Sequence, residues 1–399
     1  MEIAILGYGT VGSGVARVLE ENRELLRRRA GNDIHIRYVL DLRDFPGDPL
    51  ADRVVHDIET ILADPDVQVV AETMGGLHPA KEFVSRALAS GKSVVTSNKD
   101  MVAEFGAELM SLAAEKGVDF FYEASVGGGI PIIRAMDTAL AQEKIEEICG
   151  IVNGTTNYIL TKMEQEDCSF AEALQEAQRR GFAEQNPDND IQGRDSVRKL
   201  AILSEIAFGI NIDWKQIPVR GIENIQKEDI AAAAAAGCRI KLIAHSIEQD
   251  GHIYAAVEPM LLPLAHPLAA IQEEYNCIML RGNMVGDIYF QGKGAGSHAT
   301  GSAVVADLSA AVRNRQLGIC AHRCMEKSPA VIHDFRERPR TYLLRTNTMV
   351  AKDEWRAIPE AEGFVYRRRG VTMEQLEAEI REAAVPVWNC IAMEEEARC

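Results

Sequence analysis

The chain opens with Glu2-Ile3-Ala4-Ile5-Leu6, followed at once by Gly7-Tyr8-Gly9-Thr10-Val11-Gly12. The apolar run predicts a β-strand, and the helical spacing of Val11–Leu26 predicts a helix directly after the glycines. In that setting the glycines allow a tight turn, close approach of the backbone to a pyrophosphate, and close packing of the helix on the strand. The N-terminus of the helix then attracts the phosphates. We therefore predict that this turn binds a dinucleotide; a purely structural turn is the alternative.

Strand and helix patterns alternate through the first 125 residues. After the first strand, further strands are expected at Ile34–Leu40, Val67–Glu72, Ser93–Thr96 and Phe120–Glu123, and helices at Pro79–Ser90 and Met101–Lys116. Strands separated by helices are typical of a parallel, doubly wound sheet. The predicted fold class is therefore α/β, with a Rossmann-type nucleotide-binding domain over residues 1–130.

The pattern changes after Pro131. It predicts a strand at Ile145–Val152, a turn at Asn153-Gly154-Thr155-Thr156, helices at Phe170–Arg180, Ser196–Phe208 and Thr300–Asn314, and a hairpin of Arg239–Ile247 with His252–Met260. We interpret residues 131–314 as an α+β catalytic and dimerisation domain, whose last helix packs back on the nucleotide-binding domain. Residues 330–399 carry three more expected strands and a helix at Thr372–Ala383, which suggests a small regulatory or oligomerisation module.

Composition limits the class of protein. The chain has 399 residues, enough for two or three domains, and 47% of them are hydrophobic, yet no window resembles a membrane span. The net charge of −17 argues against nucleic-acid binding, and the first strand leaves no room for a signal peptide, so we expect a cytoplasmic protein. The eight cysteines lack a paired framework and are expected to be free thiols. A weak metal pattern joins Cys320, His322 and Cys324, and Cys399 could link two subunits.

A cluster of three acids and a lysine lies near the middle of the chain: Glu184, Asp190, Asp195 and Lys199. Asp195 and Lys199 are four residues apart, so they share one face of a helix. The apolar residues Ala201–Leu203 follow directly. We therefore expect a buried pair rather than a surface ion pair, and a buried pair is costly unless it has a function.

Two further positions are candidates at the carboxyl ends of the first domain's strands. Lys99 follows Ser93–Thr96, where a desolvated lysine could exchange protons, although a solvated surface lysine is the alternative. After the second strand, Asp41 could hold a ribose hydroxyl and favour NAD, whereas Arg43 could bind a 2′-phosphate and favour NADP. The sequence leaves that choice open.

The chain resembles homoserine dehydrogenase over residues 2–314. The motifs that carry the resemblance are Gly7–Gly12, Glu72–Gly76, Gly91–Lys99, Glu123–Pro131, Gly150–Leu160, Gly181–Lys199, Gly294–Gly296 and Thr300–Asp307. The resemblance implies an NAD(P)-dependent oxidoreductase that interconverts L-homoserine and L-aspartate 4-semialdehyde, in the biosynthesis of threonine, methionine and isoleucine. It also implies a homodimer or homotetramer.

The same resemblance implies roles for the acids and lysines. Lys199 is the proton donor or acceptor, and Lys99 assists it. Glu184 binds the ammonium group of the substrate, Asp195 holds the reacting oxygen near the lysine, and Asp190 supports the site.

Binding of the rest of the substrate and of the cofactor is also implied. The backbone around Gly154 and Thr155 helps to bind the amino-acid end of the substrate, and Gly181 and Gly296 contact the cofactor. A sodium ion is implied inside a ring of backbone carbonyl oxygens, the kind of ligand that hard cations prefer; they belong to Glu123, Val126, Gly128 and Ile130.

Some features depart from the family pattern or leave alternatives. Phe182 stands where many members have tyrosine, and Asn186-Pro187 replaces a common Asp-Pro. The C-terminal stretch resembles a shortened ACT-type effector module, and its missing length and Arg367–Arg369 leave regulation by threonine open. A semialdehyde-oxidising dehydrogenase would need a nucleophilic cysteine, and no cysteine lies in an activated motif. An inactive ligand sensor would have lost a lysine, whereas both lysines are present.

Overall fold

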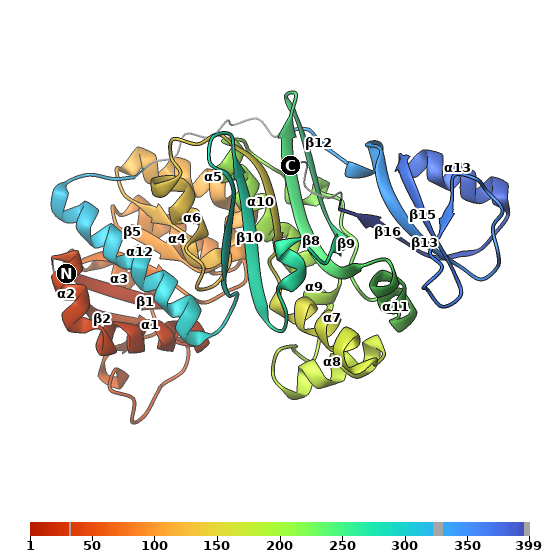
Figure 1. The fold of residues 1–399 in the computed structure, drawn as a ribbon. Helices are drawn as coiled ribbons and strands as arrows, with labels where there is room; N and C mark the ends of the chain where they lie inside the picture. The colour runs from red at the N-terminus through yellow and green to blue at the C-terminus, as the bar shows by residue number, and fades with distance from the viewer. Residues whose placement is uncertain (32, 322–329, 395–399) are drawn as a thin grey trace. The chain divides into compact units, whose positions relative to one another are not determined.

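The computed structural model describes residues 1–31, 33–321 and 330–394, and these fall into two compact units. Unit 1 comprises Met1–Glu143, Ala201–Asp213 and Gly292–Pro329; unit 2 comprises Lys144–Leu200, Trp214–Gln291 and Ala330–Cys399 (Figure 1). The division into domains at 1–130, 131–314 and 330–399 stays a prediction. Each unit is described by itself below.

Unit 1 contains the predicted parallel sheet. Its strands run in the order β3-β2-β1-β4-β5-β6, and every neighbouring pair is parallel. The bounds are β1 Glu2–Leu6, β2 His35–Leu40, β3 Val54–Val55, β4 Val67–Glu72, β5 Ser93–Thr96 and β6 Phe120–Phe121. The chain moves outward from β1 to β3 and then returns to the other side of β1 at β4. This reversal of direction is the arrangement in which doubly wound sheets bind ligands at the carboxyl ends of their strands.

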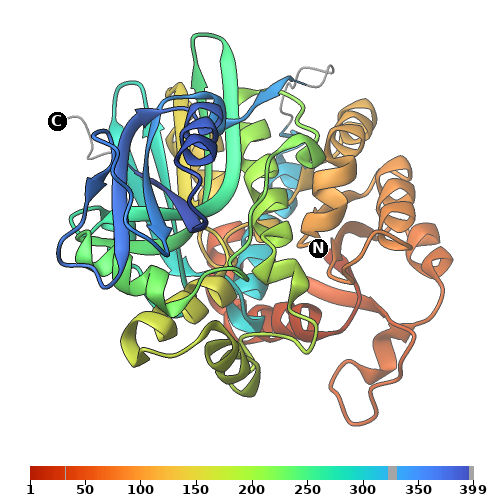
Figure 2. The ribbon, with the colours of Figure 1, turned by 90° about the vertical axis from the view of Figure 1, so that its right-hand side faces the viewer.

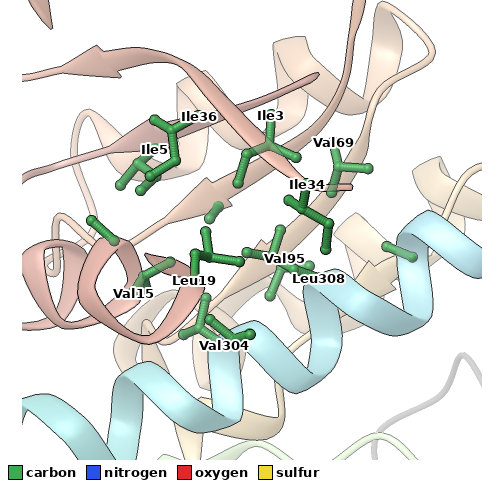
Figure 3. Packing of buried hydrophobic residues seen from close by; sticks show 14 of the residues in the cluster. Ile3, Ile5, Val15, Leu19, Ile34, Ile36, Val69, Val95, Val304 and Leu308 are labelled. Atoms are coloured by element: carbon green, nitrogen blue, oxygen red, sulfur yellow. The ribbon is translucent and has the colours of Figure 1, made fainter. Parts of the chain in front are cut away.

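One face of this sheet is covered by two helices from distant parts of the chain, α1 Thr10–Glu21 and α12 Ser297–Leu317. Figure 3 shows Ile3 and Ile5 of β1 packed with side chains of both helices. The helices approach closely at Gly14, where a Cβ atom would overlap the backbone of Ser297. Helices α4 Ala80–Ala89 and α5 Lys99–Lys116 follow β4 and β5.

Unit 2 is built on a mixed sheet with the strand order β11-β10-β7-β8-β9-β16-β13-β15-β14, to which β12 adds beside β9. The strands of its first half are β7 Ile145–Ile151, β8 Cys238–Gln249, β9 His252–Pro263, β10 Tyr275–Gly282 and β11 Gly286–Lys293. The helices are α7 Gly154–Glu166, α8 Phe170–Arg179, α9 Asp188–Ile191, α11 Lys227–Ala235 and the part of α10 Arg194–Phe208 that ends at Leu200; the rest of α10 belongs to unit 1. The predicted hairpin is confirmed, because β8 pairs with β9 along its whole length.

The C-terminal residues continue this sheet. Strands β12 Ile332–His333, β13 Arg340–Thr346, β14 Arg356–Ala357, β15 Phe364–Val371 and β16 Val387–Met393 accompany helix α13 Met373–Ala383. Strands β15 and β16 both run antiparallel to β13, which lies between them, and α13 connects them; this is a split β-α-β arrangement. Helix α13 packs beside these strands (Figure 2), with Leu376 against Tyr342 and Leu344. The ACT-like identity of the module stays a prediction.

Several helices extend two or three residues beyond the predicted bounds, and three predictions were wrong in the kind or continuity of the element. The helix expected at Val11–Leu26 is divided at Asn22, whose ψ of 13° is not helical, so that α2 Arg23–Ala30 follows α1. The strand expected at Phe120–Glu123 ends at Phe121, because Glu123 begins a 3₁₀ turn. The turn expected at Asn153–Thr156 is the start of helix α7, since the side chain of Asn153 accepts the N–H of Thr156 and caps the helix.

The expectations about free cysteines and about membrane spans can be compared with the described residues. Six cysteines there have free thiols: Cys149, Cys168, Cys238, Cys277, Cys320 and Cys390. His322, Cys324 and Cys399 lie outside the described residues, so the metal pattern and the subunit link stay untested. In the part of the chain that the structure describes, no helix combines the length and the apolar character needed to cross a membrane.

The close approach of α1 and α12 gives a stability prediction. Replacing Gly14 by alanine places a Cβ atom 2.7 Å from the Ser297 Oγ and in overlap with its carbonyl oxygen. We expect Gly14→Ala to lower the free energy of unfolding by about 1–3 kcal/mol, as overpacking does. The measurement is chemical denaturation followed by circular dichroism.

A matched control is Gly106→Ala in the middle of α5, where the nearest atom to the new Cβ is Val102 Cγ1 at 3.5 Å. This variant should be more stable by about 0.5–1 kcal/mol, because alanine is a better helix former. If Gly14→Ala were also stabilised, the packing of α1 on α12 would not be as tight as described.

Candidate active site

The glycine turn of unit 1 has the backbone shape that a dinucleotide needs. Gly7 has a φ of +88°, and a Cβ atom there would lie 2.8 Å from the Met74 Cα. A Cβ atom at Gly12 would overlap the Gly7 carbonyl oxygen, whereas the space beside Gly9 is open. Gly9 is also the N-cap residue of α1. The turn therefore presents bare backbone at a helix N-terminus, where phosphate binds.

Asp41 and Arg43 lie beside this turn and are bonded to each other. Arg43 donates from Nε to Asp41 Oδ1 at 2.9 Å and from Nη2 to Oδ2 at 3.0 Å, and its guanidinium lies over the ring of Phe45. Asp41 Oδ2 also accepts the backbone N–H of Tyr8 at 2.8 Å. These donors, Arg43 first, hold the pKa of Asp41 well below its usual range. From the sequence, Asp41 and Arg43 were alternatives that favour NAD and NADP respectively. In the structure they form one ion pair, and Asp41 also accepts a hydrogen bond from the glycine turn.

Glu72 organises the carboxyl end of β4 from a completely buried position. Its Oε1 accepts the N–H groups of Met74 at 2.8 Å and Gly75 at 3.3 Å, and its Oε2 accepts the Thr96 hydroxyl at 2.5 Å. Burial raises the pKa of this carboxyl group, and the three donors oppose the rise. Glu72 therefore ties the loop after β4 to the end of β5.

Asn98 extends this network to Lys99. The Asn98 N–H donates to the Thr96 hydroxyl at 3.0 Å, its Nδ2 donates to the Gly76 carbonyl at 2.6 Å, and its Oδ1 accepts the N–H of Met101. Asn98 thereby caps α5, of which half-buried Lys99 is the first residue. The lysine predicted from its place after a strand is held at a defined helix start.

In unit 2, Lys199 and Asp195 form a buried ion pair on the first turns of α10. The Lys199 Nζ donates to Asp195 Oδ2 at 2.6 Å and to the Val152 carbonyl at 2.8 Å. The side chains are only 11% and 5% exposed, so the pair lies in the interior and not on the surface.

Asn153 joins this pair to Asp190. Its Nδ2 donates to Asp190 Oδ1 at 2.7 Å and to Asp195 Oδ2 at 2.9 Å, while its Oδ1 caps α7. Burial raises the pKa of Asp190, and the neighbouring charge of Asp195 adds to the rise. Two carboxyl groups, one amide and one ammonium group thus lie in a single hydrogen-bonded cluster.

The segment that carries Glu184 lies beside α7. Thr155 Oγ1 donates to the Phe182 carbonyl at 2.7 Å, and the Phe182 ring packs on Tyr158 with centroids 4.7 Å apart. Gln178 Nε2 donates to the Glu184 carbonyl at 3.1 Å, and the Glu184 side chain is exposed. Glu184 thus carries an exposed carboxylate on a segment that is hydrogen-bonded to the first turn of α7. Gly181, which opens the segment, has a left-handed φ of +76°.

The glycine-rich loop of unit 1 that precedes α6 Ile132–Arg134 is tightly folded. Gly127 and Gly128 have φ values of 73° and 56°, and the Ile130 N–H closes the turn on the Gly127 carbonyl at 3.0 Å. A Cβ atom at Gly128 would lie 2.5 Å from the Gly294 carbonyl oxygen. Two residues beyond that contact, Gly296 is the N-cap of α12 with a φ of 117°.

The carboxylate of Glu123, at the start of this loop, is occupied by hydrogen bonds to the backbone of α6. It accepts the N–H groups of Ile133 at 2.9 Å and Arg134 at 2.6 Å. Burial first, and then the charge of Asp307, raises the pKa of Glu123 to about 7. Among the described residues no cluster of three or more His, Cys, Asp or Glu side chains could hold a metal ion. The sodium site that the resemblance implies at this loop, made of backbone carbonyls, stays a prediction.

The relatives of the chain agree with this chemistry. The family described as "Homoserine dehydrogenase" matches residues 131–309, and the one described as "Homoserine dehydrogenase, NAD binding domain" matches residues 7–123. The homoserine dehydrogenase of Bacillus subtilis is 38% identical over 383 residues, which cover 94% of this chain and 87% of that protein. The chain belongs to the homoserine dehydrogenase family.

Solved homoserine dehydrogenases have the same fold. The enzyme from Thiobacillus denitrificans matches with a TM-score of 0.91 and 33% identity, covering 99% of this chain and 98% of that one. A hyperthermophilic archaeal homoserine dehydrogenase mutant, in complex with NADPH, matches with a TM-score of 0.66 and 28% identity, covering 78% of this chain and 98% of that one. The predicted α/β fold, the oxidoreductase class and a nicotinamide cofactor are confirmed. The family favours homoserine dehydrogenase over the semialdehyde-oxidising enzyme and over an inactive sensor.

The positions predicted for the homoserine dehydrogenase site divide between the units. Unit 2 holds one cluster of Asp190, Asp195 and Lys199, with Glu184 in the adjoining segment. The glycine turn, Arg43, Lys99 and the carbonyl loop belong to unit 1. Sequence reasoning missed the connecting residues Glu72, Asn98 and Asn153. Each is a polar residue at or just beyond the end of a buried strand, and that position is the signal by which they could have been found.

The connecting role of Glu72 can be tested. Glu72→Gln removes the charge that three donors share, so the loop after β4 and the start of α5 lose part of their support. We expect the KM for the nicotinamide cofactor to rise roughly tenfold, because a hydrogen bond to a charged group contributes about 1.5–3 kcal/mol. Steady-state kinetics with cofactor as the varied substrate measures it.

Thr96→Ser is the matched control, because it keeps the hydroxyl that donates to Glu72. Its cofactor KM should stay close to that of the wild type. Equal cofactor KM values for all three proteins would show that the Glu72 network does not support the cofactor edge.

Proposed function

We propose that this homoserine dehydrogenase interconverts L-homoserine and L-aspartate 4-semialdehyde with Lys199 as the group that transfers the proton. The observation that carries the proposal is the buried Lys199 ammonium, bonded at 2.6 Å to Asp195 and at 2.8 Å to the Val152 carbonyl. A lysine held in this way is oriented before the substrate arrives. Bound NADP or NAD supplies or accepts the hydride, and the protein orients the substrate and neutralises charge.

In the reducing direction Lys199 gives its proton to the alkoxide oxygen that develops on the aldehyde carbon. Asp195 holds that oxygen beside the lysine, and Asp190 is tied to Asp195 through Asn153. Lys99, at the first residue of α5, assists the proton transfer. In the oxidising direction the neutral amine of Lys199 accepts the proton from the homoserine hydroxyl, with Lys99 assisting.

The amino-acid end of the substrate is bound by one carboxylate and by the backbone at a helix N-terminus. The exposed Glu184 carboxylate pairs with the ammonium group, a charge-assisted contact. The backbone of Gly154 and Thr155, in the first turn of α7, binds beside it, and the N–H groups of a helix N-terminus favour an anionic group such as the substrate carboxylate.

The cofactor would be held by the glycine turn, Arg43, Lys99, Gly181 and Gly296. The paired Arg43 and Asp41 support acceptance of NADP as well as NAD. A structural sodium ion would be held by the carbonyls of Glu123, Val126, Gly128 and Ile130, next to the left-handed turn at Gly127 and Gly128. We further propose a homodimeric or homotetrameric enzyme of the cytoplasm, which acts in the biosynthesis of threonine, methionine and isoleucine.

The role of Lys199 leads to a direct test. Lys199→Ala removes the proton donor, and general acid catalysis contributes about 10²–10⁴-fold, so kcat should fall by that factor. Cofactor affinity should stay near the wild-type value, whereas the unfolding midpoint should fall, because Asp195 is left as a buried charge without its partner. The assay follows NADPH consumption with aspartate semialdehyde and NADP reduction with homoserine.

Lys162→Ala is the matched control, because Lys162 also pairs with an acid four residues away, Glu166, at 3.1 Å. It should leave kcat unchanged. A wild-type enzyme without homoserine turnover would end the proposed function, and a Lys199→Ala variant with wild-type kcat would end the assignment of the proton donor.

Cofactor choice is tested at Arg43. Arg43→Ala should weaken NADPH selectively, because the guanidinium meets the 2′-phosphate and Asp41 would then repel it. A hydrogen bond to a charged group is worth about 1.5–3 kcal/mol, so kcat/KM for NADPH should fall about tenfold to a hundredfold. The value for NADH should stay within a small factor of wild type. Equal losses with both cofactors would mean that Arg43 serves only to hold Asp41 and the glycine turn.

A further inference from the structure

Lys241, in the middle of β8, is a charged residue that none of the proposed chemical steps uses. Its side chain is almost completely buried, with 1% exposed. The Nζ donates to Asn157 Oδ1 at 2.8 Å and to the Ile271 carbonyl at 2.5 Å, and both acceptors are neutral. Lysine is almost never fully buried unless it is paired, and burial lowers the pKa of Lys241 to about 8. Burying the Lys241 side chain without an acidic partner therefore costs considerable desolvation free energy.

The partners of Lys241 connect α7 to the segment Ile271–Tyr275. Asn157 lies in α7, one turn after the N-cap Asn153, and its Nδ2 donates to the Tyr275 carbonyl at 3.1 Å and to the Ile271 carbonyl at 3.4 Å. One turn further along the same helix, Thr161 Oγ1 accepts the Glu273 N–H at 3.2 Å. Lys241 thus fixes the orientation of the amide group that carries this connection, and it bonds the segment directly as well.

The connected segment abuts the start of α7. A Cβ atom at Gly154 would lie 2.6 Å from the Glu274 carbonyl oxygen, so only glycine fits there while the segment keeps its place. Glu273 has a φ of 57°, in the left-handed region that non-glycine residues rarely adopt. Such a conformation persists only where the surrounding contacts enforce it. Lys241, Asn157 and Thr161 contact this segment. Helix α7 adds the Lys162–Glu273 ion pair at 3.9 Å and the hydrogen bond from Gln165 to Gln272 at 3.0 Å.

We propose that Lys241 is a positioning residue for substrate binding: it holds the segment Ile271–Tyr275 against the first turn of α7 and so fixes the backbone of Gly154 and Thr155. The inference rests on the proposed role of that backbone in binding the amino-acid end of homoserine. It assigns Lys241 no contact with substrate or cofactor. Its loss should therefore affect homoserine binding more than the chemical step.

The test is Lys241→Met, which keeps an unbranched side chain shorter by one atom and removes the donor. Homoserine KM should rise about tenfold, while kcat and the cofactor KM change by less than about threefold; this split indicates lost ground-state positioning. The matched control is Lys92→Met. Lys92 is also buried, with 4% exposed, and donates to two backbone carbonyls, those of Asp64 and Val67, but it lies in unit 1, directly before β5. The Lys92→Met variant should have a lower free energy of unfolding and an unchanged KM for homoserine.

Thr161→Val keeps the inference testable if Lys241→Met does not fold, because it removes one bond to the same segment and preserves the shape of the side chain. It should raise homoserine KM a few-fold in the same direction. Wild-type homoserine KM in both unit 2 variants, or an equal rise in Lys92→Met, would overturn the positioning role. Absence of turnover in the wild type would instead overturn the proposed function, so the two failures are distinguishable.

Discussion

The interior of unit 2 holds two carboxyl groups close enough to share one donor, the Nδ2 of Asn153, at 2.7 Å and 2.9 Å. Burial raises the pKa of Asp190, and the neighbouring charge of Asp195 adds to the rise. The arrangement is stable because Lys199 neutralises Asp195 and because Asn153 supplies the missing donors. Removing any one of these partners would leave a buried charge without compensation, which is why the site depends on all of them.

In each unit one asparagine side chain both caps a helix and binds a neighbouring segment. In unit 1, Asn98 caps α5 and binds the backbone beyond β4, and in unit 2, Asn153 caps α7 and binds two carboxylates. In both, the amide oxygen accepts an N–H group of the first helical turn, and the amide nitrogen donates to a neighbouring segment: a loop in unit 1, and helices α9 and α10 in unit 2. An asparagine can do both because it carries a donor and an acceptor on one rigid group. A functional group next to such a cap, such as Lys99, is therefore held by the helix itself.

The parts of the fold that follow from local pattern were predictable. The strands at Val67–Glu72 and Ser93–Thr96 are present with the expected bounds, because buried parallel strands are near-continuous apolar runs. The pairing of Asp195 with Lys199 followed from their spacing of four residues on a helix. The break at Asn22 was not predictable in the same way, because the apolar spacing continues across it and only the backbone conformation of one residue changes.

The connecting groups could not be derived from spacing, because they join residues that are distant in sequence. Lys241 and Asn157 are 84 positions apart, and Asn153 and Asp195 are 42 apart. Asp41 and Arg43 show a different limit: the sequence presented them as competing determinants of cofactor choice, and the structure shows them as partners. A charge that is neutralised by its neighbour has less influence on an approaching phosphate than its sign alone suggests. If a 2′-phosphate binds at this position, Arg43 has to exchange at least one of its two bonds to Asp41 for the phosphate, so the two residues act on the cofactor as one bonded pair.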